Sequence, residues 1–290
     1  MASGILVIDK PEGWTSMDVC AKLRGIFHEK RVGHGGTLDP MATGVLPVFV
    51  GRATRAVEFA EKSDKEYVAG LKLGVVTNTQ DTTGEVLEER DVDVTENRLR
   101  TVLARFIGDI EQIPPMYSAI KINGKKLYEL ARKGREVERP ARSVTIKALE
   151  ILEQQGKDLY MIKVRCSKGT YIRTLCHDIG QALGCGGCMS SLRRTMAAGF
   201  TLEDAVTLEQ VQAAADPASL LLPVDCFFAG RPVLVLKSVE AEKKIRNGMT
   251  AVLPELAPGE YRVYGRNQEF LALCRAQGGK LTTIKSFFEV

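Results

Sequence analysis

Apolar and polar residues alternate along the chain in blocks that predict a mixture of strands and helices. The apolar run at residues 5–8 stops at Asp9 and predicts a short buried strand. A helix is expected from about Thr15, because apolar residues then recur at the spacing of one helix face. This face consists of Val19, Leu23, Ile26 and Phe27. A loop rich in glycine follows the helix.

Further strands and helices are expected later in the chain. Strand-like runs lie at residues 45–50, 67–73, 143–152 and 159–166, and the last two are expected to pair around a polar turn. Thr95 is a suitable cap for a helix over residues 95–107 that turns Ile107 inward and stops at Gly108. A second helix is expected at residues 172–183. The pattern therefore predicts a mixed α/β (α+β) domain.

The end of the chain has a different organisation. A boundary is expected at residues 228–232, beyond which short strand-like pieces follow one another, at residues 233–236, 261–264 and 270–274. Between them lie Lys243, Lys244 and Arg246, basic residues that could contact phosphates. We expect a small β-rich unit after the larger domain.

Composition changes this picture little. The chain has 290 residues, 40 Lys and Arg against 36 Asp and Glu, and a net charge of +4, which permits nucleic acid as a partner without identifying it. Basic residues gather between residues 121 and 142, where acidic residues dilute them. No run approaches the ~20 apolar residues that cross a bilayer. Seven cysteines, an odd number, favour reduced thiols and a cytoplasmic location.

One acidic residue stands among small residues in the glycine-rich loop, GHGGTLDPMATG at residues 33–44. Glycines allow close approach of another molecule, and Pro40 favours an extended Asp39. The loop lacks the lysine of a P-loop, and Leu38 occupies the third glycine position of a dinucleotide fingerprint. Asp39 is therefore either a displayed functional carboxylate or part of an ordinary Asp-Pro turn.

A metal site at Cys185 and Cys188 is a weaker possibility. Cys176 and His177 lie near in sequence, but they are adjacent residues on an expected helix and point in different directions. Buried thiols explain the same residues. We expect no metal.

Several motifs, in order, resemble those of the TruB-type tRNA pseudouridine synthases over about the first three-quarters of the chain. The glycine-rich loop resembles their signature loop. The further matches are DKPEGWTS at residues 9–16, KEY at 65–67, QIPPMYSAIK at 112–121, SKGTYIRT at 167–174 and LRRT at 192–195. The resemblance implies a pseudouridine synthase catalytic domain with a central, largely antiparallel sheet at residues 1–228. It also implies a small PUA-like RNA-binding domain at residues 229–290.

The resemblance also implies a reaction. Uridine becomes pseudouridine when the bond from ribose to N1 breaks, the base turns, and a bond to C5 forms, with no cofactor and no metal. The implied substrate is the uridine conventionally numbered 55 in the T-loop of the tRNA T-arm, which must leave its stack to be reached. The implied protein is a cytoplasmic monomer that needs no protein partner and no membrane.

The family's site residues fall on matching positions. Asp39 stands at the nucleophile, Tyr67 at the residue that stacks on the base and takes the C5 proton, and Arg173 at the partner of the carboxylate. Asp39 and Tyr67 are expected to meet across neighbouring strands. The implied pocket also includes His34, Tyr171 and Leu192.

Two other functions remain as alternatives. One is a guide-RNA-dependent synthase of the dyskerin type, although such proteins usually have extra basic segments outside the core, and this compact chain shows none. The other is an RNA chaperone that folds tRNA without using Asp39. The sequence leaves open whether Asp39 first attacks the sugar, adds to the base or removes a ribose proton.

Overall fold

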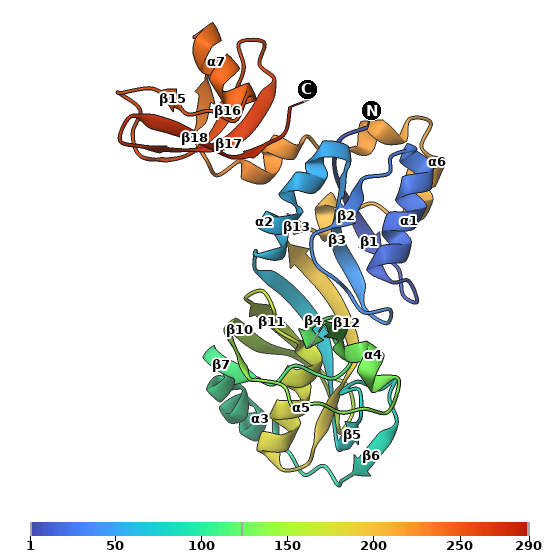
Figure 1. Cartoon of the computed structure of the whole chain (residues 1–290). Helices are drawn as coiled ribbons and strands as arrows, with labels where there is room; N and C mark the ends of the chain where they lie inside the picture. The colour runs from blue at the N-terminus through green and yellow to red at the C-terminus, as the bar shows by residue number, and fades with distance from the viewer. Residues whose placement is uncertain (1, 123, 289–290) are drawn as a thin grey trace.

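A computed structural model describes residues 2–122 and 124–288. The molecule is elongated, with a large sheet that runs along most of its length and a small β-rich unit at one end (Figure 1). Both termini lie near the small unit. Among the described helices, none is long and apolar enough to cross a membrane.

A large sheet forms the body of the protein. Its strands follow the spatial order β1-β3-β12-β4-β11-β10-β7, with β2 paired to β3 and β13 to β12. All pairs are antiparallel except β3 with β12, so the prediction of a largely antiparallel sheet in a mixed fold is confirmed. The bounds are β1 (Gly4–Lys10), β2 (Val32–His34), β3 (Thr43–Val50), β4 (Lys65–Leu73), β7 (Gly108–Gln112), β10 (Arg142–Gln154), β11 (Leu159–Cys166), β12 (Gly187–Ala197) and β13 (Phe200–Thr201).

Helix α1 (Ser16–Phe27) follows β1 as the sequence predicts. Thr15 caps it, and Asp18 completes a capping box with the backbone of Thr15. Val19 and Leu23 are fully buried against β1 and β3, whereas Ile26 and Phe27 are partly buried at the edge of the same cluster. The helix therefore fixes the start of the glycine-rich loop against the sheet.

Helices α3 (Glu96–Leu103) and α5 (Ile172–Leu183) cover one face of the sheet (Figure 1). Helix α5 has its predicted bounds, because Gly184 adopts the left-handed conformation that ends it. The prediction for α3 was wrong at its end: the chain tightens into the 3₁₀ turn η2 (Ala104–Phe106), and Ile107 is 49% exposed. Gly108, with φ of 102°, turns the chain into β7 instead.

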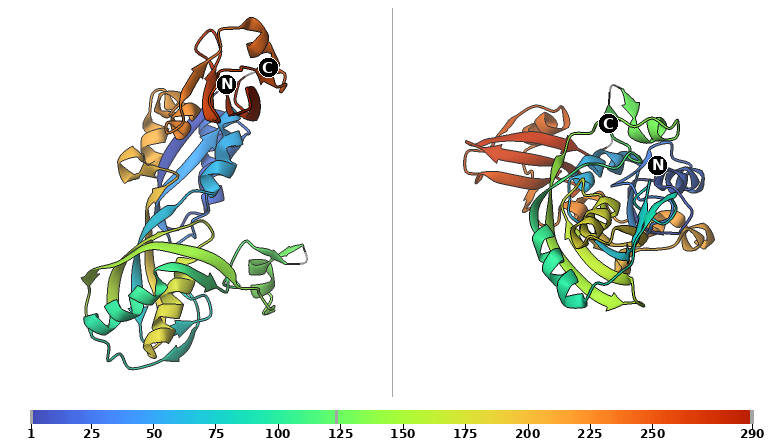
Figure 2. Two further views of the ribbon diagram at one scale, coloured as in Figure 1. Left: turned by 90° about the vertical axis from the view of Figure 1, so that its left-hand side faces the viewer. Right: turned by 90° about the horizontal axis from the view of Figure 1, so that it is seen from below.

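Two small hairpins stand beside this face. One joins β5 (Val75–Thr77) to β6 (Val86–Glu89). The other joins β8 (Lys121–Ile122) to β9 (Lys125–Lys126), continues into α4 (Leu127–Ala131), and projects from the body (Figure 2). The projecting hairpin carries part of the basic run expected from the sequence.

Short helices and turns complete the larger part of the chain. They are η1 (Gly51–Ala56), α2 (Val57–Glu61), η3 (Leu202–Asp204), α6 (Leu208–Ala213), η4 (Pro217–Leu220) and η5 (Val224–Phe228). The last of these leads into the C-terminal unit.

The C-terminal unit is a five-stranded sheet in the order β14-β16-β17-β18-β15 with one helix against it. Its elements are β14 (Val233–Val235), α7 (Val239–Arg246), β15 (Ala251–Val252), β16 (Gly259–Tyr264), β17 (Phe270–Gln277) and β18 (Lys280–Ser286). The predicted β-rich character is confirmed, whereas α7, β15 and β18 were not foreseen. The unit has an apolar core of its own.

Aromatic rings join this unit to the larger part. Phe228 is 1% exposed, and its ring centroid lies 5.4 Å from that of Phe59, 6.2 Å from that of Phe270 and 5.6 Å from that of Phe287. The contact is apolar, so the two parts share a buried interface at the position where the sequence predicts a boundary.

Candidate active site

Asp39 lies in the loop between β2 and β3, and neighbouring segments hold this loop on both sides. The backbone nitrogen of Leu38 donates to Ser16 Oγ at 2.9 Å, and the amide of Gly13 donates to the carbonyl of Pro40 at 2.8 Å. The amide of Ala42 closes a turn onto the carbonyl of Asp39 at 3.0 Å. The Asp39 side chain is nevertheless 39% exposed, so the loop displays its carboxylate.

Lys10, the last residue of β1, also holds this loop. Its side chain is buried, and Nζ donates to the carbonyls of Pro11, Trp14 and Pro40 at 2.8, 2.7 and 3.2 Å. Burial lowers the pKa of Lys10 to about 8, while the negative charge of Asp39 acts in the opposite direction. The motif at residues 9–16 thus supports the loop rather than the reacting group.

Arg173 is paired with Asp39. Its Nε lies 3.0 Å from Oδ2 of Asp39, and the arginine side chain is only 7% exposed. Arg173 lies in the first turn of α5, and Tyr171 is the N-cap residue of this helix. A buried guanidinium that pairs with a displayed carboxylate fixes its direction.

The rest of the Arg173 guanidinium is also engaged. Nη1 donates to the carbonyl of Thr79 at 3.1 Å and lies 3.6 Å from Oδ2 of Asp81, and Nη2 donates to the carbonyl of Tyr117 at 2.8 Å. Asp81 is buried and accepts from Thr83 Oγ1 at 2.6 Å. Arg173 therefore stands between two carboxylates, one displayed and one buried.

Sequence reasoning missed Asp81. It belongs to a polar stretch rich in threonine that has the composition of a surface turn. Only the fold brings this turn, at the tip of the β5–β6 hairpin, against the start of α5. No local pattern could have distinguished it.

Tyr67 lies on β4 with 8% exposure, in the same apolar cluster as Leu38. The expectation that Asp39 and Tyr67 belong to neighbouring strands was wrong, because β12 runs between β3 and β4. Burial raises the pKa of the Tyr67 phenol, while the Arg194 guanidinium on β12 acts in the opposite direction; the charge of Asp39 also contributes to raising it. The loop of Asp39 nevertheless packs in the same apolar cluster as Tyr67, through Leu38 and Ala42.

The remaining predicted residues lie around these groups. Burial raises the pKa of Tyr171, which feels the charges of Arg173 and Asp39, and Leu192 packs in the cluster that contains Tyr67. His34 ends β2 with a buried Nδ1, and among the described residues no hydrogen bond reaches that atom. Burial lowers the pKa of His34. The roles of all six residues stay predictions.

The cysteines do not assemble a cluster with other ligands. Cys185 and Cys188 are buried, and in the part of the chain that the structure describes no three His, Cys, Asp or Glu side chains are grouped to hold a metal ion. Burial raises the pKa of the Cys188 thiol to about 11, which disfavours the thiolate.

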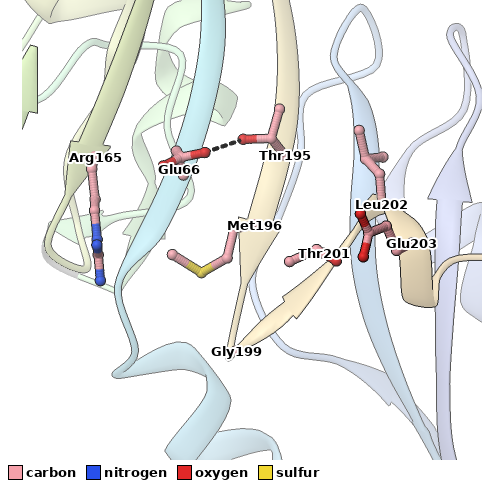
Figure 3. Close-up of a pocket in the computed structure, with 8 residues that line it drawn as sticks. All are labelled: Glu66, Arg165, Thr195, Met196, Gly199, Thr201, Leu202 and Glu203. Carbon is pink, nitrogen blue, oxygen red and sulfur yellow. Dashed lines mark hydrogen bonds between the residues drawn. The ribbon is translucent and has the colours of Figure 1, made fainter.

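An open groove of about 550 Å³ lies elsewhere, between β4, β11, β12 and β13 (Figure 3). Glu66 lines it, and successive residues of a strand point to opposite faces of a sheet, so it opens on the face away from Tyr67. Thr195 Oγ1 donates to Glu66 at 2.9 Å inside the groove. The groove is separate from the site around Asp39.

Comparison with known proteins agrees with the geometry. The family model for the TruB family pseudouridylate synthase N-terminal domain matches residues 24–172, and that for the tRNA pseudouridylate synthase B C-terminal domain matches residues 173–228. The chain belongs to the TruB family of tRNA pseudouridine synthases. The predicted family and enzyme class, an isomerase that acts on tRNA, are therefore confirmed.

Individual relatives cover most of the chain. The tRNA pseudouridine synthase B of Alkaliphilus oremlandii is 50% identical over 246 residues, which span 85% of this chain and 82% of that protein. The tRNA pseudouridine synthase B of Ralstonia nicotianae is 44% identical over 289 residues, spanning 96% and 92%.

Solved structures show the same fold. A Cbf5-Nop10-Gar1 complex contains a chain that aligns with a TM-score of 0.75 at 28% identity, over 98% of this chain and 85% of that one. An H/ACA RNP bound to a substrate RNA containing 2'-deoxyuridine gives a TM-score of 0.73 at 26% identity, over 99% and 85%.

Proposed function

We propose that this enzyme converts the T-loop uridine conventionally numbered 55 of tRNA into pseudouridine, with Asp39 as the nucleophile. The observation that carries the proposal is the 3.0 Å ion pair between a displayed Asp39 and a buried Arg173. A carboxylate can act as a nucleophile without a neighbouring base to activate it. Arg173 is buried itself and fixes the direction of the carboxylate.

Tyr67 supplies the second function in this proposal. Once the bond from ribose to N1 has broken and C1′ has bonded to C5, the proton on C5 must leave and N1 must gain one. The Tyr67 hydroxyl oxygen takes the C5 proton as its own proton passes to water, N1 takes a proton from water, and the Tyr67 ring stacks on the turned-out base. Stacking on an aromatic ring returns ~1–3 kcal/mol per base, enough to offset part of the cost of leaving the helix.

The proposal assigns residues 1–228 to catalysis and residues 229–290 to RNA binding as a separate domain. The apolar core of the C-terminal unit supports this division. Three basic residues of this unit are expected to contact phosphates, but two of them have carboxylate partners. Arg246 lies 2.6 Å from Glu269, and Lys244 lies 2.7 Å from Glu240. Lys243, on the same helix, is the remaining candidate of the three.

Tritium release from a T-arm transcript labelled at C5 of uridine tests the proposed function. The purified protein alone should release tritium from the transcript, and none from a transcript with cytidine at position 55 and labelled uridine elsewhere. Primer-extension mapping should place the product at position 55. Release that requires an added guide RNA would support the dyskerin-type alternative, and tRNA folding without release would support the chaperone.

A further inference from the structure

Arg194 is the largest of the fully buried side chains in the described structure, at 1% exposure. It lies on β12, in the interior of the large sheet. Within residues 2–122 and 124–288, no carboxylate lies within ion-pair distance of its guanidinium. Removing a cation from water without a counter-ion is strongly unfavourable, so its contacts must compensate.

Those contacts are backbone carbonyls of the loop that displays Asp39. Nε donates to the carbonyl of Val45 at 2.7 Å, Nη2 to that of Gly36 at 3.1 Å, and Nη1 to that of Thr37 at 3.4 Å. Two of these carbonyls precede Asp39 and one follows it. One planar group therefore binds the chain on both sides of Asp39 through three separate nitrogens, a spread of donors that a single ammonium nitrogen lacks.

The loop is also moulded to the Arg194 backbone. Gly44 has φ of 100°, and a Cβ atom there would lie 2.2 Å from the carbonyl oxygen of Arg194. Gly36 has φ of 127°, and its Cβ would lie 3.6 Å from Nη1 of Arg194. Gly44 thus allows the start of β3 to pass close to the backbone of Arg194, and the positive φ of Gly36 favours glycine at that position.

Arg194 reaches Tyr67 as well. The two residues are direct partners in the antiparallel pairing of β4 with β12, so their side chains leave the same face side by side. The positive charge of Arg194 is the largest influence that opposes the effect of burial on the Tyr67 phenol. The guanidinium therefore contacts both segments that carry the proposed reacting groups.

We propose that Arg194 is a positioning residue for the reaction, which sets the loop of Asp39 and the side chain of Tyr67 relative to each other across β12. The proposal rests on the proposed roles of Asp39 and Tyr67. Arg194 does not reach the substrate, because it is buried beneath the loop.

The charge of Arg194 has a cost for its neighbours. Burial lowers the pKa of Lys10 and of Lys65 to about 8, and the positive charge of Arg194 acts in the same direction. A neutral side chain would avoid this repulsion, but it would lack the planar fork of donors that binds the carbonyls of Gly36, Thr37 and Val45.

The test compares Arg194→Lys with Arg193→Lys. Arg193 is the adjacent residue on β12, and its guanidinium pairs with Asp9 at 2.8 Å with 43% of its side chain exposed. Arg194→Lys keeps the charge but replaces the three separate nitrogen donors Nε, Nη1 and Nη2 with a single nitrogen. Single-turnover rates at saturating T-arm transcript, transcript affinity, and hydrogen exchange of the free protein are measured for both.

Arg194→Lys should slow the single-turnover rate at least about tenfold and leave affinity within about threefold. Exchange should quicken at residues 33–45 and in β4 but not in β10 or β11. Arg193→Lys should stay within about twofold of the wild type in all measurements. An unchanged Arg194→Lys rate, or faster exchange everywhere, would overturn the proposal.

Two further results complete the design. If Arg194→Lys does not fold, Arg194→Gln replaces it, and failure of both would make Arg194 a folding residue and overturn the proposal. If the wild type itself forms no product with the transcript, the proposed function fails, and local exchange at residues 33–45 still decides whether Arg194 holds the loop.

Discussion

Arg173→Met removes the cation that joins the displayed carboxylate to the buried one. Methionine is an unbranched side chain of similar length. The variant loses the ion pair with Asp39 at 3.0 Å and the contact with Asp81 at 3.6 Å. It also loses the hydrogen bonds to the carbonyls of Thr79 and Tyr117. Helix α5 should persist, because methionine is a good helix former.

The size of the effect follows from these contacts. A hydrogen bond to a charged group contributes about 1.5–3 kcal/mol. At about 1.4 kcal/mol per factor of ten, losing the hold on Asp39 should lower the turnover rate roughly 10- to 150-fold. Asp81 would remain buried without its cation, so the free energy of unfolding should fall by about 3 kcal/mol, the lower end for a broken buried pair.

The assay is single-turnover tritium release at saturating T-arm transcript, with affinity measured separately by filter binding. Arg98→Met is the matched control, because Arg98 donates to the carbonyl of Leu183 at the other end of α5, at 2.9 Å. The control should turn over like the wild type. A loss of affinity with an unchanged turnover rate for Arg173→Met would show that Arg173 binds phosphate, and would refute the reasoning.

Three further predictions concern the surroundings of the site. Asp81→Asn should lower the turnover rate about tenfold with affinity unchanged, because the amide no longer balances Arg173; equal rates in single-turnover assays would contradict this. Activity should survive chelation, and Cys188→Ser should stay active; bound zinc whose removal stops turnover on folded RNA would overturn the expectation. Since burial lowers the pKa of Lys10 and of Lys65 from 10.5 to about 8, the unfolded chain holds protons between these pH values that the folded protein has lost, so the free energy of unfolding should receive a rising contribution across that window. Lys10→Met should remove part of that rise in denaturant titrations, and an identical pH profile would contradict it.

Local patterns predicted most of the large domain. The strand at β1, the capped start of α1 and the whole of α5 follow from apolar spacing and from residues such as Thr15 and Gly184 that begin or end a helix. The end of α3 did not, because the apolar Ile107 fits the helical period but lies past the tightened turn. Helix α7 was missed because a short, highly charged segment has little apolar signal.

The residues of the site likewise include some that the sequence predicts and some that it does not. Asp39 is recognisable because proline and small residues surround it in sequence, and the match to family motifs adds Arg173 and Tyr67. The strand between them was unforeseen, since the parallel contact of β12 with β3 joins residues about 150 positions apart. The contacts of Asp81 with Arg173 and of Arg194 with Val45 also join residues far apart in the sequence. A local sequence pattern therefore could not predict the roles of Asp81 and Arg194.

The central claim is that Asp39 is the group on which the reaction depends. Asp39→Asn keeps the shape of the side chain and removes its charge, and mass spectrometry of the purified variant confirms that the amide is intact. In single- and multiple-turnover tritium release from the T-arm transcript, the variant should form no product, while its affinity for the transcript stays within about threefold of the wild type. Repeated turnover by the intact Asn variant would contradict the account.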